Sequence, residues 1–163
     1  MFFTEDEDLE KGELILRRKY NTLSKDELSL IKPIWALRLE EMQSPHHPDL
    51  FKKFPEQFHE YCFLKAKVET LLLDSDLRYS ELDANNIFDN RWHHEYRYIT
   101  TLERWQQGLP VDPPLCDYNK ELKVSDGRHR IVLCYYLGIN TIPISVRAEK
   151  VDLIREKFSF EQM

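Results

Sequence analysis

The spacing of apolar residues changes from a mainly helical to a mainly alternating pattern near the middle of the chain. In the first 75 residues, capping boxes at Thr4–Glu7 and Ser24–Glu27 mark two helix starts, each followed by apolar side chains. Pro55 suits the first position of a further helix, which the apolar spacing continues to about Leu73. We therefore expect three or four helices over residues 1–75.

The second half predicts short strands and helices in alternation. Residues 77–82 and 141–146 have the alternation of strands, and residues 115–118 and 121–124 are expected to form a hairpin. Helices are expected over 91–107, 128–138 and 150–158. Because Pro143 cannot donate to a ladder, we expect it at a sheet edge or among the first residues of its strand.

These elements predict an α+β fold, with a small mixed sheet and packed helices preceded by an N-terminal helical extension. We expect the extension over residues 1–75, the α+β domain over 76–149, and a short helix and tail over 150–163. Three roles of the extension stay open: covering an active cleft, binding a protein partner, or completing the core.

The stretch from Asp126 to Arg130 is the strongest candidate for a functional site. Gly127 has no Cβ, so it can take a positive φ and let a ligand approach the backbone. The N–H groups that follow are unpaired at a helix N-terminus, which favours anions, and Arg128, His129 and Arg130 surround the same turn. We expect phosphate there. The alternative is a structural turn, with Asp126 as N-cap and Arg130 in a surface ion pair.

The block ELKVSDGRHRIVLCYYLGINTIPISV resembles the signature of the ParB/sulfiredoxin superfamily. In that family a strand enters a turn of the D-G-x-H-R type, a helix ends in L-G, and an I-P-x-x-V strand follows. The upstream segment GLPVDPPLCDYNKEL also fits the pattern, and the resemblance extends over about residues 77–148. Members include partition proteins that bind DNA and CTP, sulfiredoxins, ATP- or ADP-dependent small-molecule kinases, and proteins described as nucleases.

The resemblance implies a nucleotide-binding phosphotransferase or NTP hydrolase that uses ATP or another nucleotide, with Mg²⁺. The N–H groups of Gly127 to His129 would hold a phosphate, and Arg128 and Arg130 would neutralise the charge that develops during transfer. His129 would orient a phosphate oxygen or act as acid or base, and Asp126 would fix the turn or help to hold Mg²⁺. Sulfiredoxins have a cysteine where this chain has Arg128, so sulfinic-acid repair is not expected.

Two other functions stay open: a ParB-like nuclease, and a non-catalytic interaction or inhibitor protein that works through the N-terminal helices. The sequence does not place the catalytic carboxylate of the kinase branch. Its candidates by neighbourhood are Glu81, Asp83 and Glu95. No metal site is predicted, since the adjacent His93 and His94 would point to different faces of a helix.

Charge and composition restrict the partners. The net charge is −6, and neither half of the chain has an excess of basic residues, so a broad nucleic-acid surface is not expected. We expect a nucleotide and a small-molecule or protein acceptor as partners. The sequence predicts no secretory signal and no membrane span. Its three cysteines suit a reducing compartment, and we expect a cytoplasmic location.

Overall fold

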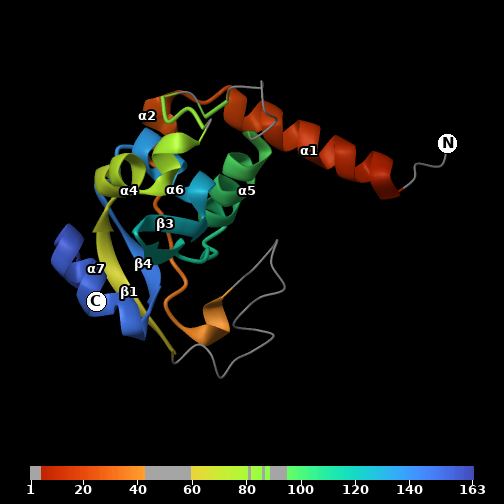
Figure 1. Ribbon diagram of the computed structural model, residues 1–163. Coiled ribbons are helices and arrows are strands. Elements are labelled where there is room, and N and C mark those ends of the chain that lie inside the picture. Colours follow the sequence, from red (N-terminus) through yellow and green to blue (C-terminus); the bar gives the residue numbers. More distant parts are fainter. Residues whose placement is uncertain (1–4, 43–59, 81, 86, 89–94) are drawn as a thin grey trace.

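The computed structural model describes residues 5–42, 60–80, 82–85, 87–88 and 95–163 (Figure 1). Five strands lie within these residues and form one sheet, in the order β3-β2-β4-β1-β5. The strands are β1 (Tyr61–Lys67), β2 (Leu115–Asn119), β3 (Glu121–Asp126), β4 (Thr141–Arg147) and β5 (Glu161–Gln162). Because β2 is parallel to β4 and the other neighbours are antiparallel, the expected small mixed sheet is confirmed.

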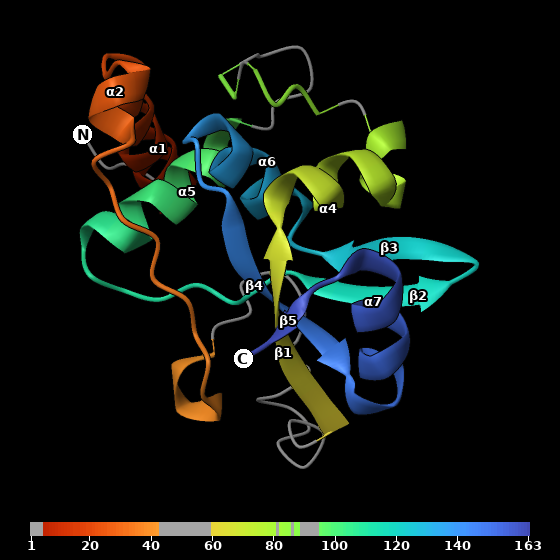
Figure 2. The same cartoon turned by 90° about the vertical axis from the view of Figure 1, so that its left-hand side faces the viewer.

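Helices cover the sheet on both sides. The described α-helices are α1 (Glu5–Asn21), α2 (Lys25–Leu28), α4 (Val68–Asp74), α5 (Glu95–Gln106), α6 (Arg128–Tyr136) and α7 (Val151–Phe158). Figures 1 and 2 show α7 on one side of the sheet and α4, α5 and α6 gathered on the other. Accordingly, β4 is buried at every position from 142 to 146, as expected for a strand with both faces covered.

The helix expected from Pro55 to Leu73 is wrong in its central part. Tyr61–Lys67 is a strand, and only Val68–Asp74 is helical. In β1, Leu64 and Ala66 are buried while Lys65 and Lys67 are exposed, which is the period of two that a strand requires. Residues 55–59 lie outside the described residues.

The expected boundary at residue 75 does not separate two units. All seven residues of β1 pair with β4, so the sheet includes a strand from the segment assigned to the extension. The tail also joins the sheet, because β5 follows α7 and pairs with Leu64 and Lys65 of β1. The extension proper is therefore α1, α2 and the segment that follows them to residue 42.

That N-terminal segment contacts the second half of the chain at several places, among them these two. Tyr20 of α1 is fully buried and donates a hydrogen bond to Glu103 of α5. Further along, Trp35 forms an isolated bridge with Val111, and its ring meets that of Trp105 edge-on at 5.5 Å. The outer part of α1 projects from the body of the molecule (Figure 1).

Pro143 lies in the third position of a central strand, not at a sheet edge. Ser145 donates its N–H to the Pro114 carbonyl at 2.8 Å, toward β2. Backbone groups two residues apart in a strand face the same side, so the Pro143 nitrogen also faces β2. β2 pairs with β4 in parallel at Leu115 and Ser145. Pro143, two residues earlier in β4, therefore lies beside the residues that precede β2, where it displaces no ladder bond.

The segment after α4 also differs from the expectation. Residues 77–82 were expected to form a strand, but Asp76–Tyr79 forms a short 3-10 helix, η3. Ser75 is its N-cap and accepts the Leu77 N–H at 3.0 Å. Ser75 also bridges Leu122, so η3 lies along the outer edge of β3 and covers it.

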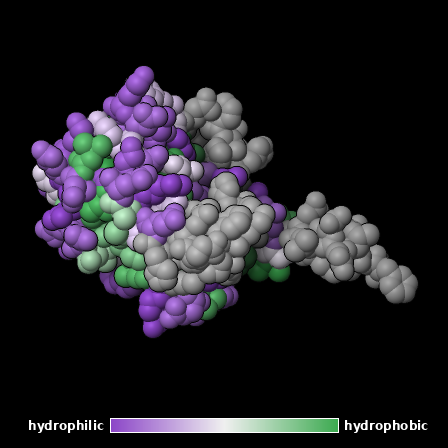
Figure 3. Space-filling model, turned by 60° about the horizontal axis from the view of Figure 1, so that its bottom comes forward, coloured by the Kyte–Doolittle hydropathy of each residue, from purple (hydrophilic) through white to green (hydrophobic). Residues whose placement is uncertain are grey.

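The hydrophilic surface agrees with the high proportion of charged residues, 32% of the chain. The face shown in Figure 3 is mainly hydrophilic, with separate hydrophobic patches outside the grey residues. None of the helices in the described ranges is long and apolar enough to cross a bilayer.

Candidate functional site

The turn at Gly127 has the backbone conformation expected from the sequence. β3 ends at Asp126, Gly127 has φ +92°, and α6 begins at Arg128. The Ile131 N–H donates to the Gly127 carbonyl at 3.1 Å and closes the first helical turn. The N–H groups of Arg128, His129 and Arg130 therefore occupy the positions that have no intrahelical acceptor, and the positive end of the helix dipole lies among them.

The role expected of Gly127 is only partly correct. Its positive φ requires glycine, but the side of its Cα where a Cβ would stand is already filled. A Cβ there would lie 2.7 Å from the Pro114 Cα and 2.9 Å from Arg130 Nη2. The glycine therefore allows the turn to pack against the segment before β2. It does not clear that side for a ligand.

Arg130 lies beneath the turn and not on the surface. Its side chain is only 14% exposed, so the ion pair of the structural alternative is present but lies partly below the surface. Its described ion pair joins Nη2 to Asp126 Oδ2 at 3.3 Å, and Asp126 itself is 42% exposed. Among the described residues the buried Nε of Arg130 has no hydrogen-bond acceptor. The guanidinium is thus largely removed from water but poorly compensated.

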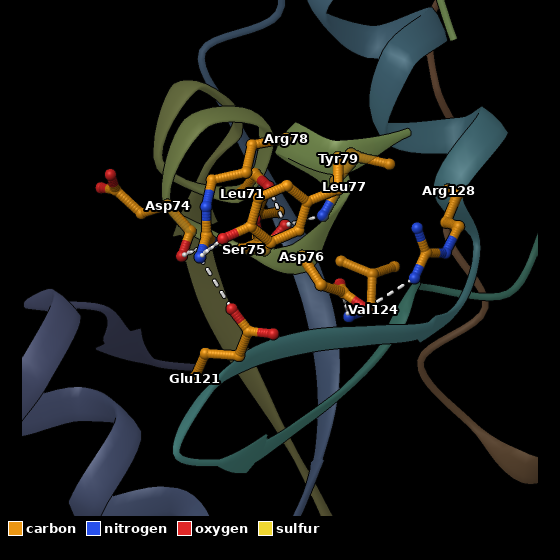
Figure 4. A network of polar contacts seen from close by, with 10 residues as sticks. All are labelled: Leu71, Asp74, Ser75, Asp76, Leu77, Arg78, Tyr79, Glu121, Val124 and Arg128. Atoms are coloured by element: carbon orange, nitrogen blue, oxygen red, sulfur yellow. Dashed lines mark hydrogen bonds and ion pairs between the residues drawn. The ribbon is translucent and has the colours of Figure 1, made fainter. Parts of the chain in front are cut away.

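Arg128 points to the other side of the turn and meets a residue that the sequence did not indicate. Its Nη2 donates to Asp76 Oδ2 at 2.6 Å, and Asp76 Oδ1 accepts the Val124 N–H at 2.9 Å (Figure 4). One carboxylate therefore joins η3, β3 and the start of α6. No local pattern could have revealed this, since Asp76 and Arg128 are 52 positions apart.

His129 packs toward α5. Its ring lies 5.4 Å from that of Tyr98, which is 2% exposed. Burial, together with the negative charge of Asp83, raises the pKa of the Tyr98 hydroxyl, so this phenol stays neutral at physiological pH. The charge of Asp83 thus acts on the residue that contacts His129, and its role as the unplaced carboxylate stays a prediction.

The other residues that the sequence named by neighbourhood have no described side chains. Glu81, His93 and His94 lie outside the described residues, and Glu95 is described only as the first residue of α5. No cluster of three metal-ligating side chains occurs within the described ranges.

The cysteines near the site are poor nucleophiles. Burial raises the pKa of the Cys116 thiol, and the charges of Asp76 and Asp117 raise it further. Burial also raises the pKa of Cys134, while the nearby Arg130 guanidinium opposes that shift. Neither thiol is a ready thiolate, so the chemistry available at the turn belongs to arginine, histidine, carboxylate and backbone N–H groups.

A surface depression of about 350 Å³ lies at the opposite end of α6. Its lining includes Lys67, Tyr135, Gly138 and Asn140, which surround the helix C-terminus and the start of α4. Since the turn lies at the N-terminus of α6, this depression is not part of the same site.

No protein-family model matches the chain, and neither the curated proteins nor the solved structures that were compared with it gave a match.

Proposed function

We propose that this chain binds the phosphate groups of a nucleotide at the N-terminus of α6 and acts as a phosphotransferase or NTP hydrolase of ParB/sulfiredoxin type. The nucleotide is ATP or a related triphosphate, accompanied by Mg²⁺. The observation that carries the proposal is Arg130, a largely buried guanidinium next to helix N–H groups that have no intrahelical acceptor, whose described ion pair is one long bond to a carboxylate.

A buried charge is costly unless it is paired and hydrogen-bonded. Asp126 compensates Arg130 weakly, because the bond is 3.3 Å long and the carboxylate is 42% exposed to water. A phosphate at the turn would accept from the N–H groups and from Arg130 together, in the low-dielectric surroundings where such bonds are strongest. The proposed ligand therefore supplies what the guanidinium lacks.

The other residues have complementary roles in this proposal. Arg128 neutralises charge on the outer side of the phosphate, and His129 orients one of its oxygens. When the phosphate replaces Asp126 at Arg130, the Asp126 carboxylate would be available to hold Mg²⁺, which would neutralise phosphate charge, or to face the acceptor. The bond between the terminal phosphorus and its bridging oxygen breaks, and a bond to the acceptor oxygen forms. The acceptor proton passes to His129 or Asp126.

Thermal unfolding of the purified chain tests the proposal with ATP, ADP, CTP and GTP, each with and without Mg²⁺. A ligand that binds only the folded state stabilises it by about 2.7 kcal/mol at one hundred times its Kd, which shifts the midpoint measurably. We expect a shift with at least one nucleotide and its loss in Arg130→Gln. No shift with any nucleotide in the wild type would overturn the proposal.

Arg104→Gln is the matched control for this experiment. Arg104 is also a partly buried arginine, but it donates to the Pro110 carbonyl at 3.1 and 2.9 Å and lies in the last turn of α5. The variant removes the same charge away from the turn, so it should keep the nucleotide-dependent shift. Equal losses in the two variants would mean that net charge, and not the turn, governs binding.

A second candidate function is that of an interaction protein that binds its partner through the N-terminal segment. The observation that favours it is the projecting helix α1, on which Leu14 and Ile15 are 53% and 67% exposed (Figure 1). Replacing both with serine would weaken partner capture under this alternative and leave nucleotide binding unchanged under the first.

A further inference from the structure

We propose that Asp76 is a positioning residue for the phosphate site, which fixes the Arg128 guanidinium before the ligand arrives. The inference rests on the proposed function, since positioning has a purpose only if Arg128 contacts the ligand. It adds a residue outside the Asp126–Arg130 motif and connects the site to the segment between β1 and α5.

Asp76 is itself held firmly. Ser75 is fully buried, donates its hydroxyl to the Leu71 carbonyl and accepts the Leu77 N–H. The backbone of Ser75 bridges Leu122 on β3. The first residue of η3 is therefore fixed by α4 on one side and by the sheet on the other.

Both oxygens of the Asp76 carboxylate are occupied, each by a different element. Oδ1 accepts the Val124 N–H at 2.9 Å, and Oδ2 accepts from Arg128 at 2.6 Å. The backbone bond fixes where the carboxylate stands, so Arg128 is held by a group that cannot follow its motion. The Asp76 side chain is 20% exposed, which makes this ion pair less screened than a fully solvated one.

Arg128 keeps donors for a ligand after this bond is made. Its described hydrogen bond uses Nη2 alone of a guanidinium with five N–H groups, and the side chain is 36% exposed. An arginine that is oriented in advance loses less rotamer freedom when it binds phosphate. Asp76 thereby lowers the entropic cost of binding, even though its negative charge by itself opposes an anion.

The same segment offers an internal comparison. Arg78 donates to Glu121 at 2.7 Å, an arginine–carboxylate bond of similar length that joins η3 to β3, with side chains 34% and 35% exposed. Figure 4 shows this pair on the opposite side of η3 from Arg128, toward the hairpin end of β3. The Arg78–Glu121 pair has the same chemistry as the Asp76–Arg128 pair but does not involve the Asp126–Arg130 turn. Variants of this pair therefore measure only the structural cost of losing such an ion pair.

Calorimetric titration with ATP and with inorganic tripolyphosphate tests the inference on the full chain. In Asp76→Asn the amide oxygen can still accept from Val124, but Arg128 loses its ion pair. We expect Kd for both probes to rise about two- to tenfold, the range for immobilising one long side chain. Glu121→Gln should leave Kd unchanged.

Two further readouts separate positioning from structural support. Asp76→Asn should add nothing in an Arg128→Gln background, whereas a structural role would still weaken binding there. The Arg128 Nε–H resonance, assigned by its absence in Arg128→Gln, should also broaden or shift in Asp76→Asn in the absence of ligand.

The outcomes are distinct. If the wild type binds neither ATP nor tripolyphosphate, the proposed function fails and the inference fails with it. If the wild type binds and Asp76→Asn binds equally or more tightly, the inference alone is overturned, because the carboxylate then either has no role or masks Arg128.

Discussion

At the scale of single residues, Gly127 is constrained by its neighbours more than by a ligand. Its φ of +92° acts together with the nearness of Pro114, whose Cα would lie 2.7 Å from any Cβ added at this position. The positive φ disfavours any residue with a side chain, and the closeness of Pro114 leaves no space for a Cβ. A valine at this position would therefore cost considerable stability.

Gly127→Ala should lower the free energy of unfolding by about 2–5 kcal/mol. Of this, about 1–2 kcal/mol comes from the left-handed conformation and about 1–3 kcal/mol from the crowding against Pro114. Gly138→Ala is the control, because Gly138 has φ +75° at the other end of α6 but open space around it. Denaturant titration of both variants gives the difference. Equal losses of unfolding free energy in the two variants would show that Pro114 moves aside without a cost in stability.

The Asp126–Arg130 turn could be predicted because its signals are local. A strand, a glycine and a helix with a glycine after its end follow one another within the same short stretch. The compensation of its charges could not be predicted in the same way. Whether Arg128 faces Asp76, and how deeply Arg130 is buried, depends on segments that approach the turn only after folding.

At the scale of elements, β1 shows why the helix prediction failed. Phe58, Cys62 and Ala66 fit a helical spacing, whereas Leu64 and Ala66 fit an alternating one. Local spacing does not decide between the two. Pairing with β4 decides in favour of the strand, because it places Leu64 opposite Ile144 and Ala66 opposite Ile142, all four buried.

The attachment of α1 to α5 should depend on pH through Glu103. The hydrogen bond from Tyr20 is the largest influence on the Glu103 carboxyl and lowers its pKa. Burial comes next and opposes that shift, and Lys19 and Gln107 lower the pKa further. A carboxyl whose pKa is lower in the folded state stabilises the fold above its unfolded pKa of about 4.3. That stabilisation is lost as the pH falls through the lower, folded-state pKa.

We therefore expect the stability difference between the wild type and Glu103→Gln to be largest near pH 6 and to shrink below about pH 4. Denaturant unfolding at a series of pH values measures it. Glu13→Gln is the control, since Glu13 pairs with Arg17 within α1, and its described ion pair joins α1 to no second helix. A Glu103→Gln difference that stays constant from pH 6 to pH 3 would contradict this account.

At the scale of the whole molecule, the sheet unites parts of the chain that the sequence assigned to separate units. β1 comes from the first half, β2 to β4 from the second, and β5 from the tail. The candidate site likewise joins segments far apart in the chain, because Asp76 reaches the turn from the segment directly after α4. The motif supplies the backbone and the arginines, and the remote segment determines how one of them is held.

This arrangement predicts where the chain can be shortened. A fragment of residues 76–163 lacks β1 and α4, so β4 loses its seven paired residues and the core loses Leu64, Ala66 and Leu71. We expect that fragment to show no cooperative thermal transition by circular dichroism. A fragment of residues 60–163 keeps every strand of the sheet and should unfold cooperatively, at a lower temperature than the full chain.

The lower temperature follows from the contacts that the longer fragment still loses. Tyr20 and Leu28 are fully buried in the complete chain, and removing the segment that contains them exposes the surface of α5 on which α1 packs. The sheet itself does not need that segment, since its strands pair among residues 61–162. A cooperative transition in residues 76–163 would show that β1 is dispensable. If neither fragment shows a cooperative transition, the N-terminal segment is an integral part of the core.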